Sequence, residues 1–343
     1  MSKKEKVPHE KFAEFQNKYG IIPAGDKNNI HLIKSRMLQG IYRNQKIENT
    51  YCNEFFGNNG FGDGGFVNFM RNKRLMKDAK NEFGEIKKRD RLTSVKRLLT
   101  NLLSSQPMAF NLFLPMKWDN FRLGNAVFKE LFPFLNIKEL VEIKMEYVPN
   151  DEKERITIDN SCFDVFVRYE NNNNEIGGIG IEVKYTESFS QSNYWDIDKI
   201  RVKDQKNLSA EKILEEQTRK KKRYTDGIEK YSEQFAMEKS KEYLQARHNQ
   251  LFRNQLIAER VKSETAIKNC ILAVVHSEKD EKCKEIVAEF RKLIKLENSC
   301  VAVSIEQIVQ SAIKASADFP ETKSLYENIY NRYCDYGFVE RFF

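Results

Sequence analysis

Two carboxylates and one ammonium, from Asp164, Glu182 and Lys184, could together assist a hydrolysis through a bound metal ion. They belong to two apolar runs with β-branched and aromatic residues, and an Asn- and Gly-rich stretch separates these runs. This pattern predicts a β-hairpin. Because side chains alternate between the two faces of a strand, Glu182 and Lys184 share one face, and the hairpin register can bring Asp164 to them.

Two oxygen ligands are the smallest protein contribution to a Mg²⁺ site that keeps its waters and binds a substrate phosphate. A lysine beside them can hold or activate the attacking water. The alternative is a strand that exposes polar residues on its solvent face. The catalytic interpretation is favoured because the strand around Glu182 is apolar and interrupted by glycines, and because an unpaired charge in the apolar strand of Asp164 is costly.

These residues resemble the motif of the PD-(D/E)XK nuclease superfamily, in which an Asp on one strand precedes Glu-x-Lys on the next. Asp164, Glu182 and Lys184 match that motif residue by residue, whereas Phe163 stands where many members have proline. The resemblance implies an α/β fold with a restriction-endonuclease-like αβββαβ core, a mixed central sheet flanked by helices. It also implies phosphodiester hydrolysis with Mg²⁺, for which Mn²⁺ can substitute.

A narrower resemblance, to a bacterial subgroup of restriction-like nucleases, rests on residues 104–113, 181–187 and 249–255. It implies that Gln106, beside a proline, lies at the rim of the active site; the open alternative is a buried hydrogen-bonding role. In the superfamily an acidic residue on the first core helix often assists the metal. Glu130 holds that position here and is therefore a third candidate metal ligand.

One predicted helix carries three polar side chains toward the same side. Gln250, Arg253 and Asn254 are spaced i, i+3 and i+4, so they share a helix face. All three are candidate substrate-binding residues, because an arginine on such a face can bridge a scissile phosphate. Structural pairing on the helix, or pairing with neighbours of Glu182, is the alternative.

The chain carries a net charge of +8 with a pI near 8.9, which suits a polyanionic partner. Basic residues concentrate at 73–97 and at 219–223, where Lys220, Lys221 and Lys222 are candidate DNA contacts. Solvated helix faces explain both runs equally well. The charge becomes informative only together with the carboxylates and the lysine of the hairpin.

Several other classes of protein are disfavoured by composition. Six scattered cysteines and four scattered histidines give no zinc spacing and no disulfide framework. No apolar run is long enough to span a membrane and the N-terminus lacks a signal core, so a cytoplasmic protein without a membrane partner is expected. The glycine-rich stretch 56–66 lacks the Gly-Lys-Ser/Thr of a phosphate-binding loop, and a turn is favoured there.

The order of predicted elements agrees with the implied core. Helices are expected at 121–140 with an interruption at Pro133, at 207–265 and at 279–297, and strands at 142–148, 155–158, in the hairpin, at 270–275 and at 300–304. Three regions follow: a helical and loop extension at 1–100, the nuclease core at 101–316, and an aromatic-rich tail at 317–343 packed on it.

The function expected from these features is Mg²⁺-dependent endonucleolytic cleavage of DNA, with duplex DNA as partner and a restriction or defence setting implied by the resemblance. One alternative is a catalytically inactive nucleic-acid-binding module with the same fold. Another is an RNA-directed nuclease or a non-nuclease enzyme, because fold does not imply function. The sequence leaves the oligomeric state open, and a homodimer is compatible with it.

Overall fold

The computed structural model describes residues 13, 29–46, 68–70, 72–88, 98–99, 101–147, 161–202 and 205–341. Three features of the sequence fall wholly or partly outside these residues. They are the glycine-rich stretch 56–66, the expected strand at 155–158 and much of the second half of the basic run at 73–97.

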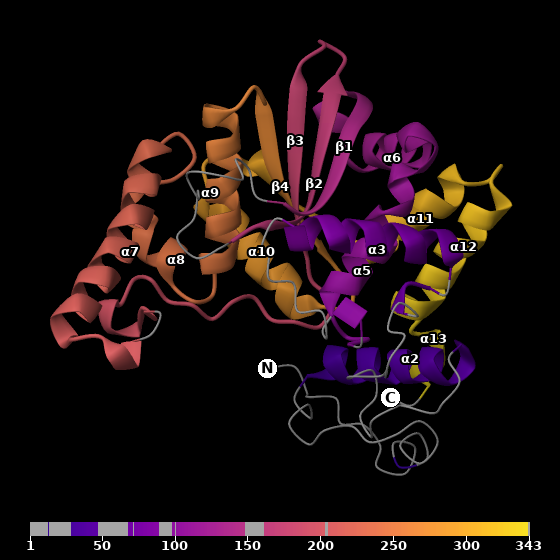
Figure 1. Ribbon diagram of the computed structural model, residues 1–343, viewed down its shortest axis with the longest axis horizontal. Coiled ribbons are helices and arrows are strands. Elements are labelled where there is room, and N and C mark those ends of the chain that lie inside the picture. Colours follow the sequence, from indigo (N-terminus) through magenta and orange to yellow (C-terminus); the bar gives the residue numbers. More distant parts are fainter. Residues whose placement is uncertain are drawn as a thin grey trace.

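In the described part of the chain, five strands form one mixed sheet in the order β1-β2-β3-β4-β5 (Figure 1). The strands are β1 (Ile137–Tyr147), β2 (Phe163–Asn171), β3 (Ile176–Val183), β4 (Asn269–His276) and β5 (Cys300–Ser304). Strands β1, β2 and β3 pair antiparallel, and β3, β4 and β5 pair parallel. The predicted α/β class with a mixed sheet is confirmed.

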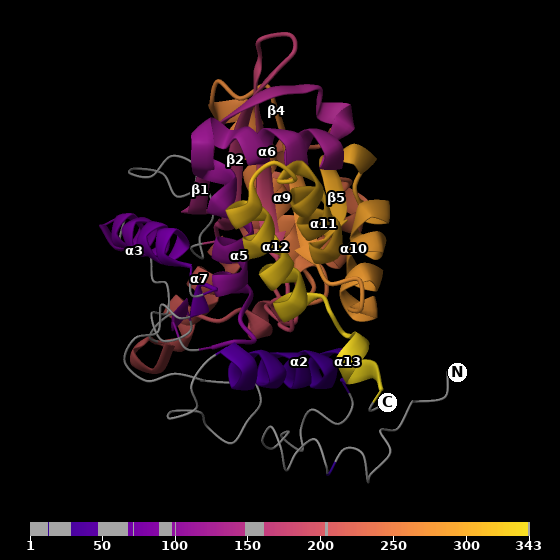
Figure 2. The same ribbon diagram turned by 90° about the vertical axis from the view of Figure 1, so that its right-hand side faces the viewer.

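Helices lie on both faces of this sheet. They are α2 (Ile30–Lys46), α3 (Lys73–Lys88), α5 (Ser105–Phe113), α6 (Trp118–Leu131), α7 (Ala210–Lys230), α8 (Ser240–Leu244), α9 (Asn249–Glu264), α10 (Glu281–Leu293), α11 (Ile305–Ala315), α12 (Pro320–Tyr333) and α13 (Gly337–Glu340). Figures 1 and 2 show α6, α11 and α12 on one side of the sheet, and α9 and α10 on the other.

Alternation along β4 shows why both faces are covered. Ile271, Ala273 and Val275 belong to the core shared with α5, α6, α11 and α12. Cys270, Leu272 and Val274 belong to the second core, shared with α7, α8, α9 and α10. A strand buried on both faces reads as a continuous apolar run, which is how β4 was identified from sequence.

Glycines in β3 make room for aromatic rings from β2. A Cβ atom on Gly180 would lie 2.2 Å from the ring of Phe163, and one on Gly177 would lie 2.1 Å from the ring of Tyr169. The close approach expected from the glycines is therefore present. Phe163 packs over Gly180 in the core beside α9, whereas Val165 lies in the opposite core.

The segment expected to be helical at 121–140 is partly strand. Helix α6 ends at Leu131, a 3-10 turn covers Pro133–Leu135, and β1 begins at Ile137. Proline lacks the N–H that a continuing helix needs. Asn136 then adopts a left-handed conformation with φ 51°, which turns the chain into the strand.

Helix α2 lies below the lower end of the sheet and contacts the residue that follows Lys184 (Figure 2). His31 Nε2 lies 2.7 Å from the carbonyl oxygen of Tyr185, and Gln39 donates to the hydroxyl of Tyr185 at 3.0 Å. Arg332 of α12, fully buried, donates in turn to Gln39 at 3.1 Å. These contacts with α2 thus fix the chain just after the end of β3.

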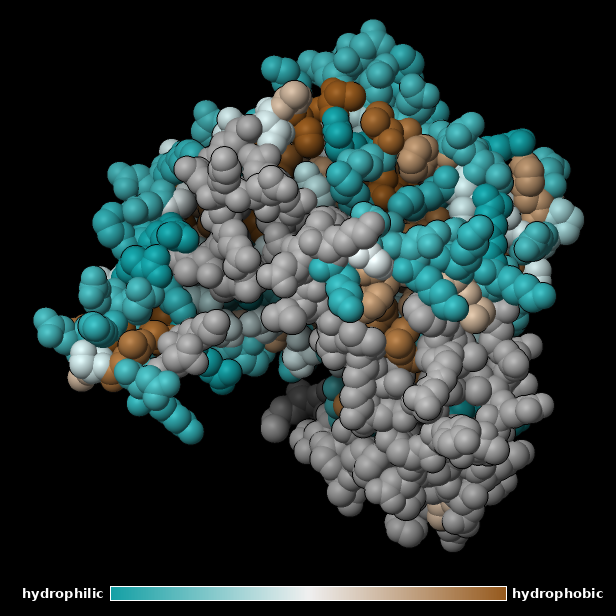
Figure 3. All heavy atoms as spheres, in the orientation of Figure 1, coloured by the Kyte–Doolittle hydropathy of each residue, from teal (hydrophilic) through white to brown (hydrophobic). Residues whose placement is uncertain are grey.

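The described surface carries only small apolar patches on the face shown in Figure 3. The exposed large apolar side chains are dispersed over different elements: Phe134, Val141, Leu214, Met237 and Leu296. Among the described helices, none is both long and apolar enough to cross a bilayer.

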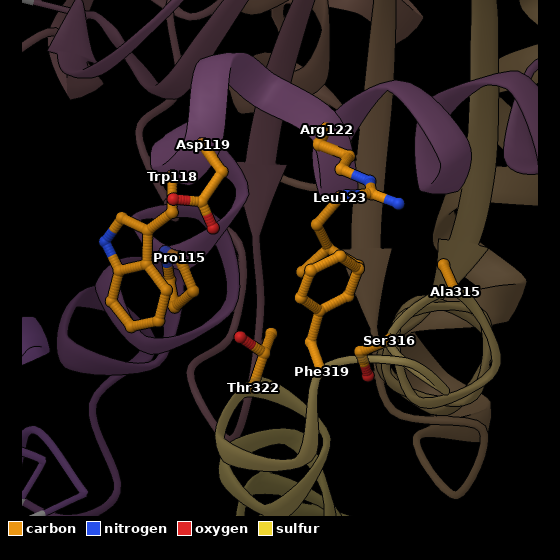
Figure 4. Close-up of a pocket in the computed structure, with 9 residues that line it drawn as sticks. All are labelled: Pro115, Trp118, Asp119, Arg122, Leu123, Ala315, Ser316, Phe319 and Thr322. Atoms are coloured by element: carbon orange, nitrogen blue, oxygen red, sulfur yellow. The ribbon is translucent and has the colours of Figure 1, made fainter.

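A small cavity lies between the start of α6 and the α11–α12 connection, where the guanidinium of Arg122 stacks 4.3 Å from the ring centroid of Phe319 (Figure 4). Its volume of about 20 Å³ is room for roughly one water molecule. It is therefore too small for a substrate, and no residue of the β2–β3 hairpin lines it.

Candidate active site

Three carboxylates lie side by side across the lower ends of β1, β2 and β3. Glu146 falls between the register pairs Met145–Val165 and Tyr147–Phe163, which places it opposite Asp164. One step beyond the pair Val165–Ile181, Asp164 in turn meets the end of β3 at Glu182. The strand register alone therefore gathers three acidic residues at one edge.

Backbone hydrogen bonds fix this edge on both sides of β3. The Asp164 carboxylate accepts the N–H of Val183 at 2.7 Å. The N–H of Lys184 donates to the carbonyl of Val275 in β4 at 2.8 Å. The segment that carries Glu182 and Lys184 is thus held between two neighbouring strands.

Glu182 and Lys184 form a buried ion pair. Lys184 Nζ lies 2.8 Å from Glu182 Oε1, and the two residues are 7% and 4% exposed. Burial alone would lower the pKa of Lys184, but the carboxylates of Glu182 and Asp164 outweigh it and raise that pKa. Lys184 is accordingly a cation at neutral pH.

Helix α9 supplies two amides that hold the Glu182 carboxylate. Gln250 Nε2 donates to Oε1 at 2.6 Å, and Asn254 Nδ2 donates to Oε2 at 2.7 Å. The i, i+4 spacing puts both amides on the helix face that meets the sheet. The Gln250 oxygen also accepts Lys184 Nζ at 3.3 Å, so one side chain orients both members of the pair.

Glu146 was not identified from the sequence. Its carboxylate accepts from Gln106 at 2.7 Å and from the Cys162 thiol at 3.5 Å. Gln106 is therefore linked to the site by its hydrogen bond to Glu146. The alternation of the predicted strand at 142–148 could have placed Glu146 on this face, but only the β1–β2 register shows that it meets Asp164.

The site holds more negative than positive charge. Burial raises the pKa of Asp164 well above its usual range, and the neighbouring Glu182 and Glu146 raise it further, against the opposing effect of Lys184. Burial and the same acidic neighbours raise the pKa of the Cys162 thiol. Three carboxylates face one ammonium, which is an environment that a bound cation would stabilise.

The structure does not bring Glu130 to this site. Its carboxylate bonds Ser311 at 3.0 Å and Lys314 at 3.1 Å, both on α11. Helix α6 leads directly into the start of β1, where Ile137 pairs with Asn171 beside the hairpin turn. Glu130 therefore lies at the opposite end of the sheet from Asp164, whereas Glu146 of β1 lies opposite Asp164.

The remaining candidates lie around the site rather than in it. Arg253 donates to Ser161 Oγ at 2.6 Å, just before β2. On α7, Lys220 donates to the Arg201 carbonyl at 2.6 Å, and Lys221 lies 4.3 Å from the ring centroid of Trp195. Lys222 pairs with Asp226 of its own helix at 2.9 Å.

The segments on which the subgroup resemblance rests are neighbours in space. Ser105 donates from its N–H to Glu187 at 2.9 Å, and Thr186 Oγ1 donates to the Leu103 carbonyl at 3.1 Å. These contacts join the start of α5 to the chain that leaves β3. Their proximity explains how both segments could form one motif, while the subgroup itself stays a prediction.

Among the described residues, no three acidic, histidine or cysteine side chains converge closely enough to hold a metal ion by themselves. Mg²⁺ does not need three, because it commonly binds one or two carboxylates together with waters and substrate phosphates. Asp164 and Glu182 supply such oxygen donors next to uncompensated negative charge. The residues present therefore fit a Mg²⁺ ion.

Comparison with known proteins identifies the family of the chain. No curated protein and no solved structure matches the chain. A family model described as the PD-(D/E)XK nuclease superfamily matches residues 29–335, a stretch that contains Asp164, Glu182, Lys184 and every strand of the sheet. By this match over most of its length, the chain belongs to the PD-(D/E)XK nuclease superfamily.

Proposed function

We propose that this chain is a Mg²⁺-dependent endonuclease that hydrolyses phosphodiester bonds in DNA. The observation that supports the proposal most directly is the row of carboxylates from Glu146, Asp164 and Glu182 with Lys184 bonded to its end. Membership of a nuclease superfamily makes a nucleic acid the expected substrate.

Asp164 and Glu182 would hold the metal, with Glu146 rather than Glu130 as the third acid nearby. Glu182 Oε2 accepts one hydrogen bond, from Asn254, and so keeps a lone pair for a ligand. Bound here, Mg²⁺ supplies polarisation of the phosphate and a lowered pKa of its water. Gln250 and Asn254 fix the orientation of the Glu182 carboxylate beforehand.

Lys184 holds the attacking water and stabilises the negative charge that develops on the phosphate. Its ammonium has three N–H donors, of which Glu182 and Gln250 engage two in the described structure. No acceptor among the described residues takes the third donor, although the ring centroid of Phe189 lies 5.1 Å from Nζ, and this donor would serve water or a phosphate oxygen. The Glu182 carboxylate keeps the lysine charged, which makes it an electrostatic group and not a proton acceptor.

Duplex DNA is the proposed substrate because of the +8 net charge and the lysines of α7. The restriction or defence setting rests on the subgroup resemblance. Digestion of unmodified and modified plasmid DNA, with Mg²⁺ and with EDTA, tests the activity, and end mapping shows where it cuts. A parallel RNA substrate distinguishes an RNA-directed nuclease.

Asp164→Ala and Glu182→Ala should abolish cleavage while the fold, measured by circular dichroism, persists. Glu130→Ala is the matched control, because it removes a carboxylate from the opposite end of the sheet. Full activity of the Asp164→Ala or Glu182→Ala protein would contradict the assignment. DNA binding by a wild type that never cleaves would instead indicate an inactive binding module.

A further inference from the structure

A polar cavity of about 280 Å³ lies in the segment that follows β3 and Lys184 in the chain. Residues 190–194, Lys199 and Arg201 line it. These residues belong to the chain that leaves the lower end of β3 and crosses toward α7 (Figure 1). Its volume is near the lower limit of small-molecule sites, which run from about 300 Å³ upward, and it suits a single compact group.

One atom ties this cavity to the catalytic pair. The Gln250 carboxamide oxygen accepts the N–H of Ser190 at 2.7 Å and Lys184 Nζ at 3.3 Å. Ser190 and the Lys184 ammonium are therefore at most about two hydrogen-bond lengths apart. Ser190 is one of the residues that line the cavity, so this wall of the cavity lies close to a phosphate held at Lys184.

The lining has the chemistry of an anion site. Ser190 Oγ lies 3.0 Å from Ser192 Oγ, and when Ser190 donates, the hydroxyl hydrogen of Ser192 is available to a ligand. Arg201 is exposed, and its guanidinium has no hydrogen-bond partner among the residues that the structure describes. Lys199 pairs with Asp196 at 2.9 Å, but both side chains are exposed, so this pair is weak and can be exchanged.

The cavity continues into the basic surface of α7. Lys220 bonds the backbone carbonyl of Arg201, and Lys221 lies over the ring of Trp195. By contrast, the cavity beside α3 is lined by more acids than bases, which opposes a phosphate. Its charged lining residues are Arg74, Asp78, Glu82, Glu85, Lys117 and Asp119.

We propose that the cavity at residues 190–201 binds the sugar-phosphate of a nucleotide adjacent to the scissile phosphate, with Arg201 and Lys199 contacting the phosphate and Ser192 donating to it. This inference rests on the proposed nuclease function. It identifies the path of the substrate strand, which runs from Lys184 through the cavity to Lys220 and Lys221 of α7.

The test measures binding in Ca²⁺, with a fluorescein-labelled duplex and its single strand as probes, over a range of salt concentrations. Arg201→Gln and Lys199→Gln should each raise Kd on the order of tenfold, the loss expected for one charged hydrogen bond. Each should also reduce the salt slope by about 0.9 on a duplex or about 0.7 on a single strand. In cleavage assays, the change in KM should exceed the change in kcat.

Two further variants separate the cavity from general charge and from misfolding. Ser192→Phe fills the cavity without changing the charge and should reduce the slope by the same amount. Lys129→Gln removes an exposed cation from α6, near the hairpin-turn end of the sheet, and should leave the slope unchanged. Thermal melting of each variant shows whether it is folded.

Unchanged Kd and slope in folded Arg201→Gln and Ser192→Phe proteins would overturn the proposal. An equal loss in Lys129→Gln would also overturn it, because general charge would then suffice. Failure of the proposed function looks different: the wild type would not cleave in Mg²⁺, yet the reduced slope in Arg201→Gln would still support the cavity as a phosphate site.

Discussion

Gln250 holds Glu182 by a 2.6 Å hydrogen bond, although the two residues are 68 positions apart in the chain. The same carboxamide accepts Lys184 Nζ and the N–H of Ser190. The sequence predicted Gln250 as a contact to substrate, but its polar atoms are engaged by the residues of the candidate active site. Its structural position predicts an effect on the metal and on Lys184 rather than on the affinity for DNA.

Gln250→Ala should lower the cleavage rate or the apparent Mg²⁺ affinity by about 10- to 100-fold, the usual loss when a residue that orients a metal ligand is removed. The measurement is the Mg²⁺ dependence of cleavage, with DNA affinity in Ca²⁺ as a second readout. Gln255→Ala is the matched control, because Gln255 is a buried amide on the same helix that bonds Glu259 instead. Weaker DNA binding with an unchanged Mg²⁺ dependence would instead indicate that Gln250 contacts the substrate.

Lys184→Ala should reduce kcat on the order of 10² or more, because the protein then lacks one donor that stabilises transition-state charge. DNA affinity in Ca²⁺ should change far less, since Lys184 is 7% exposed and already bonded to Glu182 and Gln250. Single-turnover cleavage and fluorescence anisotropy measure the two quantities. An equal loss of binding and turnover would make Lys184 an anchor for phosphate.

The sequence predicted the hairpin and the last two strands because each has a strong local pattern. Alternating or continuous apolar runs, a turn of asparagines and the Glu-x-Lys spacing are all visible within a few residues. The glycines expected in that turn lie instead within β3. The parallel strand at 270–275 was recognised in the same way. These features depend on local geometry, and the structure reproduces them.

Glu146 could not be predicted because it depends on a pairing between distant segments. The β1–β2 register, which includes shifts between Ile137 and Glu139 and between Leu140 and Glu142, decides which acid meets Asp164. Nothing local to Glu146 carries that information. Glu130 was chosen by analogy of position on a helix, but the direction of α6 carries it to the other end of the sheet.

The pKa of Asp164 predicts how stability depends on pH without metal. A carboxylate whose pKa is raised on folding contributes stability below its ordinary pKa of about 3.9, and that contribution is lost as pH rises through the raised value. Burial, Glu182 and Glu146 raise the pKa of Asp164, and Lys184 opposes them. In EDTA, the wild type should therefore lose stability as pH rises toward neutrality.

Asp164→Asn removes this titration and can still accept the N–H of Val183. In EDTA at neutral pH it should melt at a higher temperature than the wild type, and the difference should shrink in acid. Mg²⁺ should raise the melting temperature of the wild type and leave that of Asp164→Asn nearly unchanged. A lower melting temperature for Asp164→Asn at neutral pH would show that the charged Asp164 carboxylate does not destabilise the folded protein.

The lysines of α7 should differ in their contribution to DNA binding. Replacing Lys220, Lys221 and Lys222 together by alanine should flatten the salt dependence of binding, by about 0.9 for each phosphate of duplex DNA that is no longer neutralised. Lys222→Ala alone should change it least, because Lys220 and Lys221 contact Arg201 and Trp195 near the cavity, whereas Lys222 pairs with Asp226 of its own helix. An identical salt slope in the wild type and the triple variant would show that these lysines face solvent and do not contact DNA. The basic residues at 73–88 would then be the next candidates for DNA contacts.

Glu146 and Glu130 give the sharpest comparison between the structure and the sequence-based assignment. Glu146→Gln keeps the size of the side chain but removes a charge opposite Asp164. It should weaken the apparent Mg²⁺ affinity by about 10- to 100-fold, the range for groups that support a metal ligand. Because Glu146 also raises the pKa of Asp164, the variant should reduce the loss of stability toward neutral pH in EDTA.

Glu130→Gln should leave both the Mg²⁺ dependence and that pH profile unchanged, because its carboxylate serves Ser311 and Lys314 on α11. Its expected effect is limited to a small change in thermal stability, since the pair with Lys314 is exposed. Titration of cleavage with Mg²⁺ and melting in EDTA give both readouts on the same preparations. A Mg²⁺ requirement that shifts in Glu130→Gln and not in Glu146→Gln would reverse the assignment, because only a residue near Asp164 and Glu182 can act on their metal.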